Sequence, residues 1–345
     1  MVTRWARAAL GLIVLAMDPE ASSRPDDPPS PRRFEFAEPH MGTEFRIVLY
    51  TPDESIARRA SRAAFDRIAT LDKTLTDYDP DSELMRLCAG AGGPPVALSP
   101  DLYRVLDHAK HLYDRSGGAL DVTLAPVVRL WRRARRDRKL PDPDALARAR
   151  SLVPGCGAIR LDPASRTARL LKPGMRIDLG AIAKGYASGE AIAVLKAEGI
   201  ASALVAGSGD IVVSGPPHGK LGWTIAVAPL SPDAGGQPGR SILLKDAAVS
   251  TSGDAEQFVE IAGLRYSHVI DPKTGLGLTE RRSVTVIAPD GATADGLDTA
   301  ACVLGPDRGI ALIESTPGAA GLFVRLTPEG REVRESKGWA AQAKP

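Results

Sequence analysis

The feature that most constrains the fold is the way short strand-like runs come in adjacent pairs, each pair broken by a few turn residues. Residues 203–214 form two apolar, β-branched runs around Gly207-Ser208-Gly209-Asp210, and residues 35–50 form a similar pair around Met41-Gly42-Thr43. Strands joined by such short turns pair antiparallel, because a parallel pair needs a crossover of a dozen residues or more. The sequence therefore predicts an α+β fold with mainly antiparallel sheets and packed helices, rather than a doubly wound parallel sheet.

Helical periodicity separates these strand runs. In residues 55–75 apolar side chains recur at helical spacing, at Ala60, Ala64, Ile68 and Leu71, which predicts one buried helix face. Further helices are predicted at 102–115, 181–198, 292–304 and 306–315, a hairpin at 158–171, and strands at 223–228, 241–244, 247–250, 266–270, 283–288 and 321–326.

Composition excludes some classes of partner. The 345 residues carry 44 Lys and Arg against 42 Asp and Glu, and this near balance argues against a nucleic-acid binder that relies on bulk charge. Aromatic residues make up only 5%, too few for a platform that stacks single-stranded bases. The basic stretch 130–140 has two readings, a solvated helix face or loop, or a contact with an acidic partner or a membrane.

The N-terminus predicts export. Arg4 and Arg7 precede an apolar run at 8–16 that is too short to span a bilayer, and a Pro-, Ser- and charge-rich stretch follows. An ordinary N-terminal helix is the alternative. No Cys follows the apolar run, so a lipid-anchored form is not supported, and we expect a periplasmic or cell-envelope location. The predicted division is a signal peptide at 1–16, a disordered linker at 17–33, the main domain at 34–337 and a tail at 338–345.

The cysteines do not indicate a metal or redox site. The number of cysteines is odd, since the chain has only Cys88, Cys156 and Cys302, and their positions match no CxxC motif or Cys/His metal-binding spacing. Cys88 and Cys302 lie in apolar surroundings, so we expect them to fill the core, and nothing in the sequence indicates a disulfide.

One acidic segment has the spacing of a cation site. Asp295, Asp298 and Thr299 stand at i, i+3 and i+4, so a helix would place their oxygen atoms on one face. Oxygen ligands of this kind suit Mg²⁺. The alternative is helix capping, because Asp is common in a first helical turn.

Two further segments could bind an anion. Asp178-Leu179-Gly180-Ala181 leads into a predicted helix whose N-terminal N–H groups would suit phosphate, with Lys184 one turn later. An ordinary turn into a helix with a solvent-facing Lys184 is the alternative. Gly117-Gly118 would allow a ligand to approach the backbone closely, or would simply cap the preceding helix.

His268 is one of only five histidines and precedes the turn segment Asp271-Pro272-Lys273-Thr274-Gly275. A neutral imidazole can accept a proton as a general base, whereas a structural histidine is the alternative. Thr251-Ser252-Gly253-Asp254 offers hydroxyl and N–H groups suited to phosphate, or forms a tight turn.

These segments occur in an order that resembles the ApbE family, the FAD:protein FMN transferases. The resemblance covers roughly 34–326 and implies an ApbE- or T-fold-like architecture. The segments that carry it are Met41-Gly42-Thr43, the stretch 117–131, Asp178 to Tyr186, Thr251 to Asp254 with Ser267 to Gly275, and Ala294 to Ala300.

The resemblance also implies roles for single residues. It implies that His268 and Asp295 are catalytic residues and that His268 lies near the diphosphate that is cleaved. It also implies that the backbone carbonyl of Ala181 is a metal ligand. If the match to the family is shifted by one residue, Val269 takes the place of Ile270 as the flavin contact. The implied Mg²⁺ ligands are Ala181, Asp295, Asp298 and Thr299, and the implied FAD contacts are Met41, Tyr78, Ala119, Leu120, Asp121, Asp178, Lys184 and Ile270.

The activity implied by the resemblance is Mg²⁺-dependent transfer of FMN from FAD to a Thr or Ser hydroxyl of an acceptor redox protein with an FMN-binding domain, with release of AMP. Association with membrane redox complexes is a further expectation. Two alternatives stay open: an FAD pyrophosphatase that uses water, and an exported flavin carrier without catalysis. Ser208 stands where relatives usually have Gly, and Ala255 where an aromatic is common, which leaves the fit of the substrate open.

Overall fold

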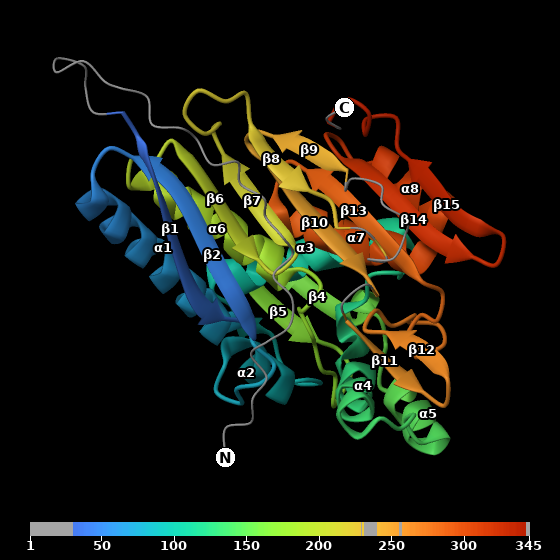
Figure 1. The fold of residues 1–345 in the computed structure, drawn as a ribbon. Helices are drawn as coiled ribbons and strands as arrows, with labels where there is room; N and C mark the ends of the chain where they lie inside the picture. The colour runs from blue at the N-terminus through green and yellow to red at the C-terminus, as the bar shows by residue number, and fades with distance from the viewer. Residues whose placement is uncertain (1–29, 229, 231–239, 255–256, 343–345) are drawn as a thin grey trace.

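An antiparallel sheet of eight strands forms the centre of the molecule (Figure 1). The structure is a computed structural model that describes residues 30–228, 230, 240–254 and 257–342. Every neighbouring pair in the sheet is antiparallel, which confirms the predicted α+β class. In spatial order the strands are β1 (Arg32–His40), β2 (Thr43–Thr51), β6 (Ser202–Gly207), β7 (Asp210–Ser214), β10 (Ala247–Gly253), β13 (Arg282–Ala288), β14 (Ala320–Thr327) and β15 (Gly330–Glu335).

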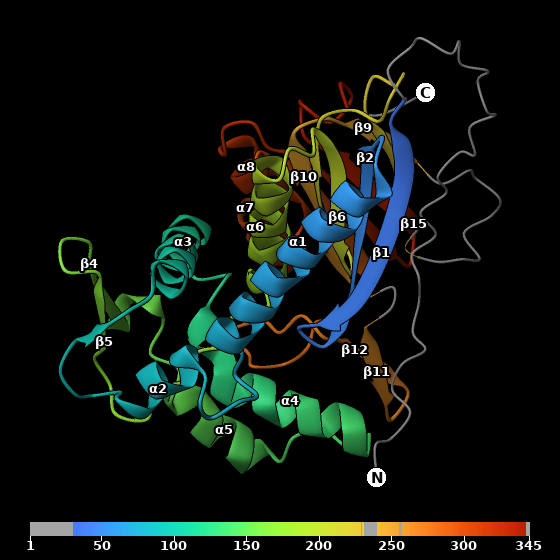
Figure 2. The same cartoon turned by 90° about the vertical axis from the view of Figure 1, so that its left-hand side faces the viewer.

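Helices cover one face of this sheet (Figure 2). The predicted apolar face of the first helix is buried as expected, with Ala60, Ala64, Ile68 and Leu71 all inaccessible to solvent. These side chains share one core with residues of the neighbouring helices and strands. The helices on this side are α1 (Glu54–Leu75), α3 (Pro100–Ser116), α6 (Ala183–Ala197), α7 (Gly291–Leu304) and α8 (Pro306–Glu314).

The other face of the sheet is covered by a small hairpin. Trp223 and Ile242 of this hairpin are buried against sheet residues such as Leu204 and Val213. Trp339 joins the same cluster and is also buried. The hairpin consists of β8 (Trp223–Ala226) and β9 (Ser241–Leu244).

A smaller group of elements lies at one end of the sheet (Figures 1 and 2). In one part of it Val127 and Trp131 pack with Tyr266. In the other part Leu84, Ile159 and Leu170 belong to the same core as the buried side chains of α1 and α3. The elements are α2 (Glu83–Ala89), β3 (Val96–Ala97), η1 (Val122–Leu124), α4 (Ala125–Asp137), α5 (Pro143–Ser151), η2 (Cys156–Ala158), β4 (Ile159–Asp162), β5 (Thr167–Leu170), β11 (Phe258–Ile261) and β12 (Leu264–Ser267).

Several boundaries differ from the prediction, each for a tertiary reason. The basic stretch belongs to a helix that starts five residues earlier, at Ala125, because Val127 and Trp131 pack against the β11–β12 hairpin. The strand expected at 266–270 ends at Ser267, so His268 follows it. The strand expected to end at residue 250 continues to Gly253, because it pairs with β13 along its length.

The chain ends also differ from the prediction. The tail expected from residue 338 is packed as far as Gln342, since Trp339 is buried and the Gln342 carbonyl accepts from the Leu243 N–H at 3.0 Å. Residues 32 and 33 of the expected linker lie in β1. The expected signal peptide and most of the linker fall outside the described residues. None of the helices in the described ranges combines the length and apolar character needed to cross a membrane.

The cysteines behave as the sequence predicts. Cys88, Cys156 and Cys302 are all buried and none forms a disulfide. Cys302 lies in α7 within the apolar cluster beneath β13 and β14.

Ser208 forms the turn between β6 and β7 with a positive φ of 62°. A residue with a Cβ is strained there, and among the residues that the structure describes its side chain makes no hydrogen bond that offsets the strain. We therefore expect Ser208→Gly to be tolerated and to raise the free energy of unfolding by up to about 1 kcal/mol. Urea unfolding of both proteins measures the difference; a loss of more than about 1 kcal/mol would show that the hydroxyl makes a contact that matters.

Candidate functional site

The structure places Asp295 and Asp298 within helix α7, as predicted, and neither carboxylate caps the helix. The cap of α7 is Asp290, whose side chain accepts from the Thr293 N–H at 2.8 Å. Asp295 and Asp298 lie further along the helix and are only 4% and 1% exposed. Thr299 is less buried, and its hydroxyl lies 3.1 Å from that of Ser252 on β10. The capping interpretation of these two carboxylates is therefore wrong.

Two strands of the central sheet bring further groups to this helix face. Val249 of β10 pairs with Ile211 of β7, and this register sets Ser250 beside Asp210. The Ser250 hydroxyl lies 2.5 Å from the Asp210 carboxylate and 2.6 Å from that of Asp298. Because a hydroxyl donates only one proton, it cannot donate to both carboxylates at once. The two carboxylates are thereby coupled through one side chain.

Lys184 supplies the positive charge of this cluster. Its ammonium lies 3.0 Å from the Asp210 carboxylate and 3.9 Å from that of Asp295, and it donates to the Gly180 carbonyl at 3.2 Å. Burial alone would lower the pKa of Lys184, but Asp210 and Asp295 raise it above its usual value. The lysine is thus a buried ion-pair partner, and the solvent-facing alternative is wrong.

The cluster holds more carboxylates than cations. Burial and the neighbouring charge of Asp210 raise the pKa of Asp295 to about 7, although Lys184 lowers it. Burial and the charges of Asp295 and Asp210 also raise the pKa of Asp298 well above its usual value. One ammonium cannot balance three ionised carboxylates in a buried site, and a divalent cation would allow them to ionise.

The backbone offers one more oxygen at this place. Gly185 is the third residue of α6, so its N–H is one of the donors at the helix start that have no acceptor within the helix, and it donates to the Asp295 carboxylate at 3.0 Å. Ala181 lies just before the N-cap residue Ile182, so its carbonyl is not an acceptor in the hydrogen-bond ladder of α6. Within the described ranges no three His, Cys, Asp or Glu side chains are arranged to hold a metal ion on their own. A cation here would need this carbonyl and the Thr299 hydroxyl as well, and the donor set fits Mg²⁺.

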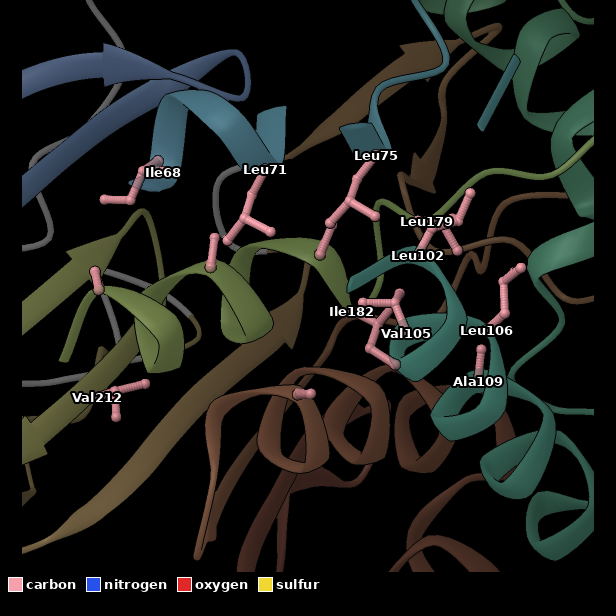
Figure 3. Packing of buried hydrophobic residues seen from close by; sticks show 14 of the residues in the cluster. Ile68, Leu71, Leu75, Leu102, Val105, Leu106, Ala109, Leu179, Ile182 and Val212 are labelled. Carbon is pink, nitrogen blue, oxygen red and sulfur yellow. The ribbon is translucent and has the colours of Figure 1, made fainter. Parts of the chain in front are cut away.

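The segment that carries these groups is anchored in the core. Leu179 and Ile182 are buried on either side of Ala181 and pack among side chains of α1 and α3, such as Leu75 and Val105 (Figure 3). The apolar side chains thus fix the backbone that presents the polar groups.

His268 follows β12 directly. Its Nδ1 lies 3.2 Å from the Gln257 carbonyl, an acceptor only, so Nδ1 carries the proton and Nε2 is left as the basic nitrogen. Burial, together with smaller effects of the charges of Arg135 and Lys184, lowers the pKa of His268 to about 4. At neutral pH the imidazole is therefore neutral and able to accept a proton.

A second ion-pair network lies beside the cluster. The guanidinium of Arg132 on α4 binds the carboxylates of Asp178 and Asp77, each at 2.6 Å, and lies 4.4 Å from the centre of the Tyr78 ring. The other oxygen of Asp178 accepts from the Gly180 N–H at 2.8 Å. Tyr78 is 77% exposed, which leaves one side of its ring open for a ligand.

The remaining predicted contacts are mostly internal. The Asp121 carboxylate accepts from the N–H and hydroxyl of Thr123, so it caps η1. Ala119 and Leu120 are buried in an apolar cluster that includes Val269. Any contact of this stretch with a ligand would therefore come from its backbone beside Gly117 and Gly118, both of which have positive φ.

Ile270 and Met41 make their contacts with other parts of the molecule than the carboxylate cluster. Ile270 is 8% exposed and packs with Trp131 against α4. Met41 and Gly42, both with positive φ, form the tight turn between β1 and β2, and the Met41 N–H donates to Asp72 at 2.8 Å. In the part of the chain that the structure describes, neither residue is in a cluster or hydrogen bond with Asp295 or Asp298.

Three residues of the site were missing from the sequence prediction. Asp210 was visible only as part of a turn, and Ser250 carried no signal at all. Arg132 was grouped with a solvated basic stretch, although its position four residues after Val128 on the inner face of α4 distinguishes it from the exposed Arg129 and Arg133.

The fold and the site define a class of protein, an enzyme with a buried acid–base centre at the helix-covered face of an antiparallel sheet. Comparison with known proteins narrows this class. The chain belongs to the ApbE family, whose model matches residues 41–323.

Curated relatives are similar over most of their length. The FAD:protein FMN transferase of Treponema pallidum (strain Nichols) is 34% identical over 325 residues, which cover 89% of this chain and 88% of that protein. The protein of the same name from Haemophilus influenzae is 33% identical over 294 residues, covering 83% and 84%. The chain is accordingly an enzyme of the transferase class.

Solved structures of flavin transferases have a similar fold. The flavin transferase ApbE from Vibrio cholerae superimposes with a TM-score of 0.80 at 28% identity, covering 90% of this chain and 99% of that one. The ApbE protein from Thermotoga maritima gives a TM-score of 0.79 at 27% identity, covering 91% and 100%.

Proposed function

We propose that this enzyme transfers FMN from FAD to a Thr or Ser hydroxyl of an acceptor redox protein and releases AMP. The names of the curated relatives support flavin transfer. The single observation that carries the finer proposal is the surplus of buried carboxylates over cations around Asp295 and Asp298, in a site where the charges of Lys184 and Asp210 also act on a neutral His268. A surplus of this kind suits a divalent cation and a substrate with phosphate oxygens.

In the proposed reaction the acceptor hydroxyl oxygen attacks the phosphorus on the riboflavin side of FAD. A new P–O bond to the acceptor forms, the P–O bond to the AMP phosphate breaks, and AMP takes the electron pair. His268 Nε2 accepts the hydroxyl proton, since this nitrogen is unprotonated at neutral pH. Lys184 and the Ala181 segment hold the acidic cluster in place beside the reacting groups.

Mg²⁺ would be held by Asp295, Asp298, the Thr299 hydroxyl and the Ala181 carbonyl. When bound, it would neutralise charge on the diphosphate oxygens of FAD. By the resemblance, Tyr78, Asp178 and the 119–121 backbone would contact FAD. We also propose that the enzyme acts on the periplasmic or cell-envelope side, following the predicted signal peptide, where its acceptors would belong to membrane redox complexes.

The test incubates the purified full chain with FAD, Mg²⁺ and an FMN-binding acceptor domain, and follows AMP release and the mass of the acceptor. We expect the acceptor to gain one FMN, and the gain to disappear with EDTA. The matched control is the same acceptor with its Thr or Ser changed to Ala, which should stay unmodified. AMP release with an unmodified acceptor would instead favour the FAD pyrophosphatase, and FAD binding without either product would favour a flavin carrier.

A further inference from the structure

Helix α4 presents two different basic faces. Arg129, Arg133 and Arg136 are exposed on its outer face, whereas Arg132 and Arg135 are partly buried on the face toward the candidate site. The spacing of three residues between Arg132 and Arg135 places them one above the other on that face.

The helix is fixed to the candidate site at two points. Its Trp131 side chain donates to the Gly275 carbonyl at 2.7 Å, which ties it to the segment that carries His268. Its Arg132 side chain binds Asp178 at 2.6 Å, which ties it to the segment that carries Lys184. A residue on this face of α4 therefore keeps a defined position relative to the reacting groups.

Arg135 lies on this face. Among the residues that the structure describes, no hydrogen bond or ion pair of its guanidinium is found. Its charge nevertheless acts on the site, because it lowers the pKa of His268 in addition to the larger effect of burial. It acts in the same direction on Tyr78, whose pKa burial raises. Arg135 is thus a cation without a partner among the described residues, and its charge reaches both His268 and Tyr78.

The other cations of the site are already satisfied. Lys184 is paired with Asp210, and Arg132 is shared by Asp77 and Asp178. A partly buried guanidinium without a partner is unfavourable, because burial removes water from donors that nothing replaces. Burial accordingly lowers the pKa of Arg135 itself, which shows the cost of its charge in this position. A bound ligand with an anionic oxygen would remove that cost.

We propose that Arg135 binds an anionic oxygen of a substrate on the face of α4 that carries Arg132 toward Asp178 and Tyr78. This inference rests on the proposed function, which supplies two sources of such an oxygen: the diphosphate of FAD and a carboxylate of the acceptor protein next to its hydroxyl. Both suit a guanidinium, whose parallel N–H groups bind phosphate and carboxylate through paired hydrogen bonds.

The first arm of the test measures binding of FAD and of riboflavin, which lacks phosphate, by flavin fluorescence in the full chain with Mg²⁺. If the anionic oxygen belongs to the diphosphate of FAD, Arg135→Gln weakens FAD binding by about 10- to 100-fold. This is the change in affinity that the loss of one charged hydrogen bond usually causes. Riboflavin binding stays unchanged, and Arg135→Lys restores part of the FAD affinity.

The second arm measures the KM for the acceptor domain at saturating FAD. If the acceptor carboxylate is the source, Arg135→Gln raises this KM by about tenfold or more while FAD affinity stays unchanged. The matched control in both arms is Arg133→Gln, an exposed arginine on the outer face of the same helix, which should change neither value. The proposal is overturned if Arg135→Gln behaves like Arg133→Gln in both arms, or if riboflavin binding weakens as much as FAD binding.

The first arm also separates this proposal from the proposed function. Flavin binding is read without any transfer, so an enzyme that fails to modify the acceptor still gives a result for Arg135. Conversely, transfer at the wild-type rate in Arg135→Gln, with FAD and acceptor both well below saturation, would contradict the role of Arg135 and leave the proposed function intact.

Discussion

Replacing Gly185 by alanine should destabilise the protein by about 3 kcal/mol and abolish its activity. Helices α6 and α7 touch here through two glycines, and a Cβ on Gly185 would lie 2.1 Å from the Gly291 carbonyl oxygen and 2.8 Å from the Cβ of Asp295. Real Cβ atoms do not approach backbone this closely, so the helices would have to separate, at the cost of an overpacked core. Separation would also break the hydrogen bond from the Gly185 N–H to Asp295.

The measurement is urea unfolding of the purified variant, together with FMN transfer to the acceptor. Gly189→Ala is the matched control, because Gly189 lies one turn later on the same helix and nothing lies within 4 Å of its added Cβ. Alanine is the better helix former, so this control should be more stable by up to about 1 kcal/mol and fully active. Equal stability of the two variants would mean that α6 and α7 do not pack through Gly185.

Replacing Asp295 by asparagine should stop FMN transfer, with a loss on the order of 10³-fold or more, and yet stabilise the metal-free protein at neutral and higher pH. The loss follows because a cation held by this carboxylate is expected to contribute several kcal/mol to the reaction. The gain follows because burial and the neighbouring Asp210 make ionisation of the Asp295 carboxylate unfavourable. Asparagine keeps an oxygen that can accept from the Gly185 N–H but carries no charge.

The sign of the pH dependence can be worked out from the shifted pKa. The folded protein holds the Asp295 proton up to a pKa of about 7, whereas the unfolded chain releases it near 3.8. Between these values the unfolded state binds fewer protons, so the free energy of unfolding of the metal-free enzyme falls as pH rises from about 4 to about 7. Asp295→Asn does not lose stability in this way. We therefore expect the variant to be more stable than the metal-free wild-type enzyme by roughly 2–4 kcal/mol at pH 8 and equally stable near pH 4.

Thermal and urea unfolding at pH 4 and pH 8, with EDTA and with Mg²⁺, measure these effects. We expect Mg²⁺ to stabilise the wild-type enzyme at pH 8 and to leave Asp295→Asn almost unchanged, since binding to the folded state alone raises stability. Asp307→Asn is the control, because its side chain is 89% exposed and should affect neither stability nor transfer. Full activity of Asp295→Asn would refute the assignment of the acidic cluster.

Part of the site could be predicted because its groups are close along the chain. Asp295, Asp298 and Thr299 share a helix face through their spacing alone, and α7 spans Gly291–Leu304, within one residue of the prediction. The antiparallel class was predictable for a similar reason, since short turns between strand runs leave only one way to pair them. The motif order that resembles the ApbE family extended this local information to the whole chain.

The sequence by itself determined which local elements form and which polar groups one helix or turn presents, because periodicity and turn chemistry act over a few residues. Only the tertiary structure decided what surrounds those groups. The pairing of β7 with β10 brings Asp210 and Ser250 to Asp298, and the packing of α4 turns Arg132 and Arg135 inward. Burial then sets the charge states of Asp295 and His268, because the free energy of a charge depends on solvent and neighbours that lie far away in the sequence.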